Sequence, residues 1–440
     1  MSDRICLRLG RGDMNTFSTI DTPGQRPVVH VAGRHAAALC PSCERPSVRT
    51  NGTGWREVID VVRTLVVTLS ICVRRFVCEW EDCEQQSFDE RFEGIDRGGA
   101  SARALAWFAD LARGRATRAV ARDLAVPEHY LRVAVGTKRS AAHHRQRGRL
   151  GRHLAIDECS VRKNFIYATV FSDPARGVVI DMAPGRDASA VLFFASLFSH
   201  SERAQVQVVT IDCHAPYRMA ARVLFPNALI VADAFHLHRR VLGALTAVRR
   251  DAWNRWRHRR RPLGKVFKDA RFALARARDD LEAEDSPTGQ RQRMAVFDAT
   301  NLDGALAVAY ELKEAFRAAM AIGRSGDTAT FVAALELFDA LCRGSKIAEF
   351  ASVAKTFGDW RREIINYAAS GGASNAFAEA IIHLIKNQKR QAHGYRSWAG
   401  FRGQILWAFG EVVDPVTGEV VVLRLLPRGQ GANHLQPWFA

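Results

Sequence analysis

The sequence predicts a multidomain α+β protein, and three observations support this fold class. Two cysteine pairs flank a run rich in β-branched residues in the first hundred positions. Beyond residue 150, five short apolar runs are separated by turn formers and by two segments with helical spacing, which predicts a mixed α/β sheet. A long stretch of amphipathic helical pattern then separates this sheet from one last apolar-periodic helix. At 440 residues, we expect two to four modules.

The charge balance favours a polyanionic partner. The chain carries 63 Lys and Arg against 46 Asp and Glu, a net charge of +17 with a pI near 10. Such a field attracts nucleic acid, the commonest polyanion for a chain of this kind. The rival partner, a membrane, is disfavoured because we find no run of about 18 uncharged apolar residues. The start at Met1-Ser-Asp-Arg also lacks the apolar core of a signal peptide, so we expect a cytoplasmic protein.

The four paired cysteines have the spacing of a metal site. They stand in Cys40-Pro-Ser-Cys43 and in Cys78-Glu-Trp-Glu-Asp-Cys83, two short knuckles that can each place a thiolate pair beside one ion. The residues between the knuckles are rich in β-branched side chains and can form the strands of a ribbon, in which Cys72 packs rather than ligates. Four Cys ligands leave no open position for water, so we expect one structural Zn²⁺. The alternative is unligated thiols.

A helical pair follows the cysteines. Helical spacing over 117–124, a break at Ala125-Val-Pro127 and a second helix from Glu128 fit a helix-turn-helix. The second helix would then offer Glu128, His129 and Arg132 to DNA. The alternative is a plain helical hairpin. The basic tract 138–152 suits a phosphate-contacting linker as well as a solvated face.

The five apolar runs place two acids at strand ends. With helices between the later runs, the first strand is expected at the centre of the sheet. Asp157 and Asp212 directly follow the first and fourth runs, so we expect both at C-terminal strand ends, side by side. The strands are expected at 154–157, 165–171, 177–182, 206–211 and 228–232, and the helices at 188–198 and 216–224.

A third acid lies on the last helix. Gly371-Gly372 precede a Ser or Asn cap, after which Glu379, Lys386 and Arg390 share one flank of an apolar-periodic helix. Three carboxylates can hold two hard cations roughly 4 Å apart for phosphoryl transfer, with the two basic residues facing DNA phosphates. Strand-end acids are usually only solvated, and composition and spacing leave Glu158, Asp181 and Asp233 as competing ligands.

From Cys40 to Leu406 the chain resembles the bacterial insertion-sequence transposases of the ISL-three family, a DDE class with a ribonuclease-H-like core. Five stretches carry this resemblance, and the first four are the two knuckles from Cys40 to Phe88, Ile156-Asp157-Glu158 with Arg162-Lys163, Asp212 with Tyr217, and 225–236 ending in Asp233-Ala-Phe-His236. The most specific stretch joins Ser374-Asn375, Glu379, Lys386, Arg390, Gly394-Tyr395 and Phe401-Arg402. Ala234 and His393 depart from the family pattern, where Arg and an aromatic residue are expected.

The resemblance implies a DDE transposase that binds insertion-sequence ends and catalyses DNA cleavage and strand transfer. Asp157, Asp212 and Glu379 would hold two Mg²⁺ ions, for which Mn²⁺ can substitute. Joining two DNA ends calls for a homodimer or a larger assembly on double-stranded DNA. A non-catalytic DNA-binding regulator derived from a transposase and a structure-specific nuclease are the alternatives.

Three further sets of residues are candidates for supporting roles. Asp233 and His236 are expected to support the metal shell or to approach DNA, against a structural hydrogen-bonded histidine. In the helical stretch, Trp253 and Trp256 precede a basic cluster that is expected to face DNA. The alternative is a solvated helix face whose tryptophans pack in the core. A turn at 285–289 precedes helices expected over 302–322 and 331–341. The additional DNA-contacting candidates are Arg257, Arg259, Arg260 and Arg402.

These expectations divide the chain into seven segments. They are a variable N-terminal segment (1–37), the zinc-binding ribbon (38–95), the helix-turn-helix with its basic linker (97–150), the first part of the ribonuclease-H-like core (151–236), an all-helical insertion (237–370), the final catalytic helix (371–412) and a C-terminal tail (413–440).

Overall fold

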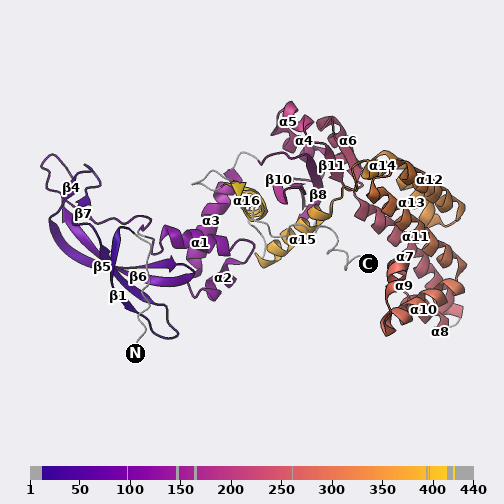
Figure 1. The fold of residues 1–440 in the computed structure, drawn as a ribbon, viewed down its shortest axis with the longest axis horizontal. Helices are drawn as coiled ribbons and strands as arrows, with labels where there is room; N and C mark the ends of the chain where they lie inside the picture. Colours follow the sequence, from indigo (N-terminus) through magenta and orange to yellow (C-terminus); the bar gives the residue numbers. More distant parts are fainter. Residues whose placement is uncertain are drawn as a thin grey trace. The chain divides into compact units, whose positions relative to one another are not determined.

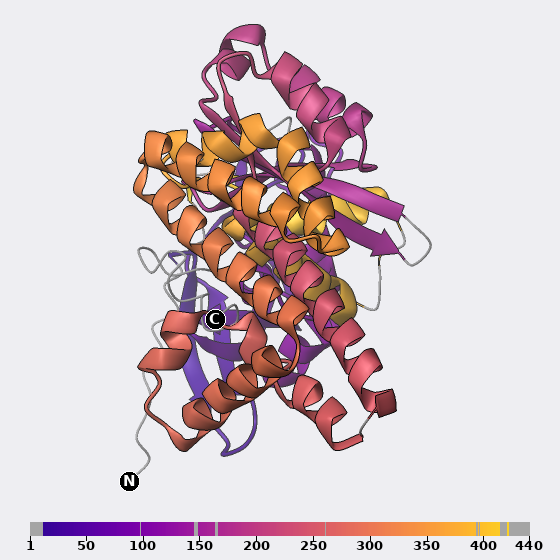
Figure 2. The ribbon, with the colours of Figure 1, turned by 90° about the vertical axis from the view of Figure 1, so that its right-hand side faces the viewer.

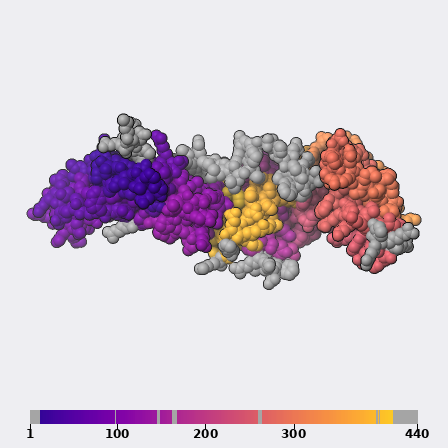
Figure 3. All heavy atoms as spheres, turned by 90° about the horizontal axis from the view of Figure 1, so that it is seen from below, coloured from indigo at the N-terminus to yellow at the C-terminus, as the bar shows by residue number. Residues whose placement is uncertain are grey.

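The computed structural model describes residues 12–96, 98–144, 148–162, 166–259, 261–392, 395, 397–413 and 420–421. The remaining residues are drawn in grey in Figure 3. The chain forms two compact units. The first comprises residues 1–144 with 388–403, and the second comprises residues 145–387 with 404–440.

A five-stranded sheet forms the first part of the first unit (Figure 1). Its strand order is β1-β2-β6-β5, with β7 beside β6, and Val67, Leu69 and Ile71 of β6 point into a buried core. β1 and β2 lie within 1–37, a segment whose sequence has no clear hydrophobic period. The apolar pattern of these two strands is short, because β1 buries only Met14 in the core and β2 only Val29 and Val31. The strands are β1 (Met14–Ile20), β2 (Val28–Gly33), β5 (Thr50–Val62), β6 (Leu65–Val77) and β7 (Ser87–Asp89), and a small separate pair is β3 (Ala38–Leu39) with β4 (Pro46–Ser47).

Three helices complete this part of the first unit: α1 (Ala102–Leu111), α2 (Thr117–Asp123) and α3 (Glu128–His144). The hydroxyl of Ser101 caps α1 by accepting from the amide of Ala104 at 3.0 Å, and it also donates to Asp60 of β5. Arg103 pairs with the same buried carboxylate at 2.7 Å, which joins the sheet to the helices. α2 and α3 lie where the spacing predicts helices, and the turn between them passes through Ala125 at φ +51°.

The second unit contains a mixed sheet of order β10-β9-β8-β11-β12. The first strand is therefore central, as the sequence predicts. β8 pairs antiparallel with β9 and parallel with β11, and β11 pairs parallel with β12. The strands are β8 (His153–Arg162), β9 (Ile166–Asp173), β10 (Val178–Pro184), β11 (Val208–Ile211) and β12 (Leu229–Ala232).

The expected end of the first strand of this sheet, at Asp157, is wrong. Asp157 does not end its strand, because β8 continues to Arg162 as one arm of the β8–β9 hairpin, where Asp157 pairs with Val170. The parallel pairing of β8 with β11 nevertheless stops at Ile156 and Ile211. Asp157 is thus the first residue beyond the parallel ladder, although it lies inside the strand.

Helices cover both sides of this sheet. Figure 1 shows α4 (Ala188–Ser196), α5 (His200–Ala204) and α6 (Ala215–Leu224) on one side and α15 (Ala376–Gln391) on the other. Phe171 of β9 stacks on Phe194 of α4 with ring centroids 3.8 Å apart. α4 and α6 match the predicted helices. α5 is an additional single-turn helix, which the capping box of Ser199 and Glu202 explains.

Between β12 and α15 the chain forms an all-helical lobe (Figure 2). One hydrophobic cluster runs from the sheet into this lobe, where Phe316, Phe338 and Phe357 pack with centroids 5.4 to 5.5 Å apart. The expected turn at 285–289 is instead a helix start, since Ser286 caps α10 and Pro287 occupies its first position. The helices are α7 (Ala234–Arg259), α8 (Arg261–Asp269), α9 (Arg278–Ala283), α10 (Pro287–Leu302), α11 (Gly304–Ser325), α12 (Thr328–Gly344), α13 (Ala348–Asp359) and α14 (Arg361–Ala369), with a 3₁₀ turn at Ala273–Ala275.

Two glycines in the left-handed region turn the chain from the lobe into α15. Gly371 and Gly372 have φ of +69° and +82°, and the amide of Gly372 closes the end of α14 on the carbonyl of Tyr367 at 2.8 Å. After α15 come α16 (Trp398–Phe409) and the short pair β13 (Val412–Val413) and β14 (Val420–Val421). Most of the predicted tail at 413–440 lies outside the described residues. None of the helices that the structure describes has the length and apolarity of a membrane span.

Lys313 makes the lobe's stability depend on pH. It is 1% exposed on α11, where its ammonium donates to the Arg276 carbonyl, pairs with Glu314 and lies 4.2 Å from the ring of Tyr310. Burial dominates over these partners and lowers the pKa of Lys313 to about 8. The unfolded chain therefore binds more protons between about pH 8 and pH 10.5.

We therefore expect the free energy of unfolding of the unmodified protein to rise with pH in this window. Measured against the Lys313→Met variant, which has no group titrating at this position, the rise should be on the order of 1–2 kcal/mol. Denaturant titrations of both proteins at pH 7.5 and 9.5 measure this difference. A difference that stays constant with pH would show that Lys313 keeps its proton in the folded lobe.

Candidate functional site

Three acids lie at the same level on three neighbouring parallel strands. Ile156 of β8 pairs with Ile211 of β11, which in turn pairs with Ala232 of β12. The next residue on each strand is an acid, and these acids are Asp157, Asp212 and Asp233. Ligand sites in such sheets form beyond the carboxyl ends of the parallel strands. The register therefore brings Asp157 and Asp212 together, as the sequence predicts, and adds Asp233 beside them.

His236 lies among these carboxylates at the start of α7. Its Nδ1 donates to Oδ2 of Asp233 at 2.9 Å and lies 2.9 Å from Oδ1 of Asp212. Because one N–H can point at only one oxygen, Oδ1 of Asp212 remains buried without a well-aligned hydrogen bond from the described residues. Asp212, Asp233 and His236 offer ligand atoms that all lie within 4.8 Å of one another.

Glu379 approaches the same place from α15. Its Oε1 lies 3.8 Å from Nδ1 of His236, and its side chain is 23% exposed. On the same helix Ile381, Ile382 and Ile385 are buried, whereas Lys386 and Arg390 are exposed, as the predicted amphipathic pattern requires. The third predicted acid thus joins the strand-borne acids from a separate element.

The accumulated negative charge changes how these groups titrate. Burial and then the neighbouring Asp212 raise the pKa of Asp157 to about 7. Burial and then Asp233 raise the pKa of Glu379 to about 8. Burial opposes the charged imidazole, but Asp212 and Asp233 outweigh it and raise the pKa of His236 to about 10. The imidazolium is therefore the cation that the protein itself supplies between its carboxylates.

The competing acids occupy different positions. Glu158 follows Asp157 on β8 and lies 3.9 Å from the guanidinium of Arg186. Asp181 is buried on β10, two strands away from β8, where it accepts from the amide of Met182. Asp233 is fully buried, and both of its oxygens accept hydrogen bonds, from the amides of Asn375 and His236 and from the His236 ring.

Comparison with known proteins identifies the family of this chain. A family model described as "Transposase", that of the ISL3 group of DDE transposases, matches residues 154–405, which is more than half of the chain. The chain belongs to this transposase family. The matched region runs from the start of β8 through the helical lobe to α16 and so contains every residue of the carboxylate site.

Two curated relatives are insertion-sequence transposases. The chain is 25% identical over 271 residues to the transposase of the element IS1001 from Bordetella parapertussis, which covers 60% of this chain and 65% of that protein. It is 27% identical over 267 residues to the IS1557 transposase of Mycobacterium tuberculosis, which covers 56% of this chain and 57% of that protein. The chain thus spans less than two thirds of the length of these relatives.

The carboxylate site of this transposase family member fits a divalent cation. Hard oxygen donors come from three elements, two of the carboxylates have raised pKa values, and one oxygen of Asp212 is buried without a well-aligned donor. A bound cation would be coordinated by these oxygens. It would also stabilise the charged carboxylates, which lowers their pKa values, and would give the buried oxygen of Asp212 a partner.

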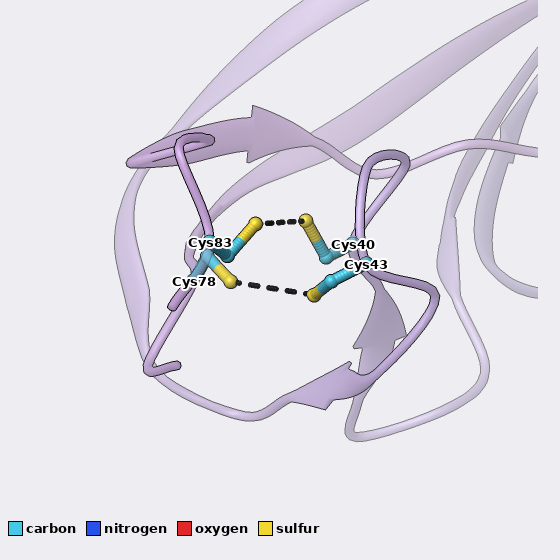
Figure 4. A group of neighbouring side chains, drawn as sticks. All are labelled: Cys40, Cys43, Cys78 and Cys83. Carbon is cyan, nitrogen blue, oxygen red and sulfur yellow. Dashed lines mark hydrogen bonds between the residues drawn. The ribbon is translucent and has the colours of Figure 1, made fainter. Parts of the chain in front are cut away.

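The four paired cysteines also converge (Figure 4). Sγ of Cys40 lies 3.8 Å from that of Cys83, and Sγ of Cys43 lies 3.8 Å from that of Cys78. A tetrahedron with metal–sulfur distances of about 2.3 Å has sulfur–sulfur edges of roughly 3.8 Å, so the spacing suits one tetrahedral ion. Cys72 is not part of this group.

The predicted DNA-contacting arginines differ in their surroundings. The side chain of Arg132 is 70% exposed on α3 and pairs with Glu128 at 3.0 Å. Arg257 is exposed and stacks over Trp253 at 4.4 Å, whereas Trp253 and Trp256 pack against the lobe's core. Arg402 donates to the carbonyl of His143 at 2.8 Å. Arg260 and the side chain of Arg259 lie outside the described residues.

Two polar residues at the site carry no chemical signal in the sequence. Asn375 is completely buried just before α15, and Thr210 is completely buried in β11, and their side chains share a hydrogen bond of 2.8 Å. A buried Asn among helix-start signals looks like an ordinary helix cap, and Thr is common in strands. Only the family resemblance at Ser374-Asn375 pointed to this position.

The raised pKa of Asp157 predicts an effect on stability. Without divalent cations, the folded protein binds more protons here than the unfolded chain between pH 3.8 and about pH 7, so stability falls as pH rises through this window. We expect Asp157→Asn to stabilise the protein at pH 8 by on the order of 2 kcal/mol and to have little effect at pH 4.

Thermal unfolding of both proteins at these two pH values, in buffers without added divalent cations, measures the effect. An equal change in melting temperature at both pH values would mean that the charged form of Asp157 does not destabilise the folded protein. Asp251→Asn, at an exposed acid on α7, is the control.

Proposed function

We propose that this protein is a DNA transposase that cuts DNA at the ends of an insertion sequence and joins the freed 3′-hydroxyl to target DNA. The observation that carries the proposal is the convergence of Asp157 and Asp212, in register on adjacent parallel strands, with Glu379 of α15. The strand order β10-β9-β8-β11-β12 supports a ribonuclease-H-like core around them. A catalytic site of this kind needs a closely spaced group of hard ligands.

Asp157, Asp212 and Glu379 would hold two Mg²⁺ ions, or Mn²⁺ in their place. When bound, the ions would supply Lewis acidity toward the attacking and leaving oxygens of a phosphodiester. The chain's own contribution is to keep the carboxylates together, to exclude water around Asp157, which is 6% exposed, and to hold the imidazole of His236 against Asp233. In strand transfer, the 3′-oxygen would form a bond to the target phosphorus while the bond from that phosphorus to the target 3′-oxygen breaks. The attacking hydroxyl would lose its proton to water, and the leaving 3′-oxygen would take up a proton from water.

Recognition of the DNA ends would fall to the first unit and to basic residues elsewhere in the chain. α2 and α3 would act as a helix-turn-helix, with Arg132 toward DNA. Lys386 and Arg390 on α15, Arg257 on α7, the neighbouring Arg259 and Arg260, and Arg402 would contact phosphates. The paired cysteines would hold one structural Zn²⁺. Two ends joined in one reaction call for a homodimer or a larger assembly.

The central test is cleavage of DNA that carries the element's terminal repeats. With Mg²⁺, we expect the unmodified protein to nick these ends, and Asp157→Ala, Asp212→Ala and Glu379→Ala each to lower the rate by about a hundredfold or more. Gel assays on end-labelled duplexes measure the products. Asp251→Ala, at an exposed acid on α7, is the matched control.

The outcomes separate the alternatives. Binding of the ends without cutting would favour a regulator, and cutting without need for terminal repeats would favour a structure-specific nuclease. Full activity in one of the three variants would remove that acid from the site.

The cysteine group predicts one zinc ion per chain. Cys43→Ser should lower the zinc content measured by inductively coupled plasma mass spectrometry and reduce the melting temperature of the first unit, because the ion links two separate knuckles. Cys72→Ser, outside the group, is the control and should retain its zinc. Equal zinc in both variants would refute the four-cysteine site.

A further inference from the structure

Asn375 lies at the point where the acid-bearing elements meet. It is completely buried, and every hydrogen bond described for it leads to one of them. Its Oδ1 accepts from the hydroxyl of Thr210 in β11 at 2.8 Å, and its Nδ2 donates to the carbonyl of Ile156 in β8 at 3.2 Å. Its amide donates to Asp233 after β12 at 3.1 Å, and its carbonyl accepts the amide of Glu379 at 2.9 Å.

Three of these four partners lie close to a proposed metal ligand in the sequence or are one. Ile156 immediately precedes Asp157, Thr210 stands two residues before Asp212, and the fourth bond ends on Glu379 itself. The side chain of this one residue, with its backbone N–H and C=O, therefore connects all three strands to the first turn of the helix that carries the third acid.

The chemistry of the bonds selects asparagine. The Ile156 carbonyl can only accept, so the amide nitrogen of Asn375 must face it, and the oxygen is then left for the Thr210 hydroxyl. Aspartate has no donor for the carbonyl and would add a charge beside Asp233. Alanine leaves a buried carbonyl and a buried hydroxyl without this partner.

We propose that Asn375 is a positioning residue, which fixes Glu379 on α15 relative to Asp157 and Asp212 so that the three carboxylates bind divalent cations as one site. The inference rests on the proposed function of these acids. Asn375 acts through the acids and does not itself contact the reacting atoms. Partners of this kind govern metal affinity because they set the orientation of the ligands.

The test measures Mn²⁺ binding to the full-length, DNA-free protein by electron paramagnetic resonance of free Mn²⁺. We expect Asn375→Ala to weaken binding about 10- to 100-fold. The matched control is Asn366→Ala, since Asn366 of α14 also donates its amide to a strand carbonyl, that of Ile230 in β12, at 2.8 Å, but contacts none of the acids. It should leave Mn²⁺ affinity within about twofold of the unmodified protein.

A second pair of variants keeps the inference testable if Asn375→Ala fails to fold. Thr210→Val removes the hydroxyl that Asn375 accepts and should weaken Mn²⁺ binding, whereas Thr210→Ser keeps the hydroxyl and should restore it. Equal Mn²⁺ affinities for the valine and serine variants, or for Asn375→Ala and Asn366→Ala, would overturn the role of Asn375.

The same measurement separates this inference from the proposed function. If the unmodified protein binds Mn²⁺ and Asn375→Ala does not, while no DNA is cut, the positioning role stands and the transposase activity fails. Failure of the unmodified protein to bind Mn²⁺ at the acids, judged against Glu379→Ala, would overturn both.

Discussion

The carboxylate site depends on the parallel register of β8, β11 and β12. The pairs Ile156–Ile211 and Ile211–Ala232 place the following residue of each strand at one edge of the sheet. Three buried or half-buried acids at one edge repel one another, and the raised pKa values of Asp157 and Glu379 record this repulsion together with their burial. Folding therefore has to assemble a group of charges that is unfavourable by itself.

The surrounding structure offsets this repulsion with fixed hydrogen-bond partners. His236 places its ring between Asp212 and Asp233, and Asn375 ties Asp233 to the start of α15. A hydrophobic core that continues from the sheet into the helical lobe supports these contacts. The burial of its apolar side chains supplies free energy of folding that offsets the cost of bringing the carboxylates together. The lobe thus gives stability to the sheet from which it projects.

Much of this arrangement could be predicted, because apolar periodicity reports burial directly. The five strands of the second unit, the helices α2, α3, α4 and α6, and the central place of β8 follow from β-branched runs and helical spacing. The continuation of β8 past Asp157 could not be predicted, because it depends on antiparallel pairing with β9, which extends beyond the end of the parallel pairing with β11. Three contacts of Asn375 could not be predicted either, because the partners Asp233, Thr210 and Ile156 lie 142 to 219 positions away in the sequence.

The positive charge that points to DNA is unevenly distributed along the chain. Residues 12–96, which form the first sheet and carry the four cysteines, contain nine arginines and no lysine against thirteen Asp and Glu residues. A metal ion held by four thiolates would add further negative charge there. Long-range attraction of a polyanion must therefore come from the remaining residues, which carry the whole excess of +17 and more. If the first sheet contacts DNA at all, it does so through the shape and hydrogen-bonding groups of its surface, because its net charge opposes the approach.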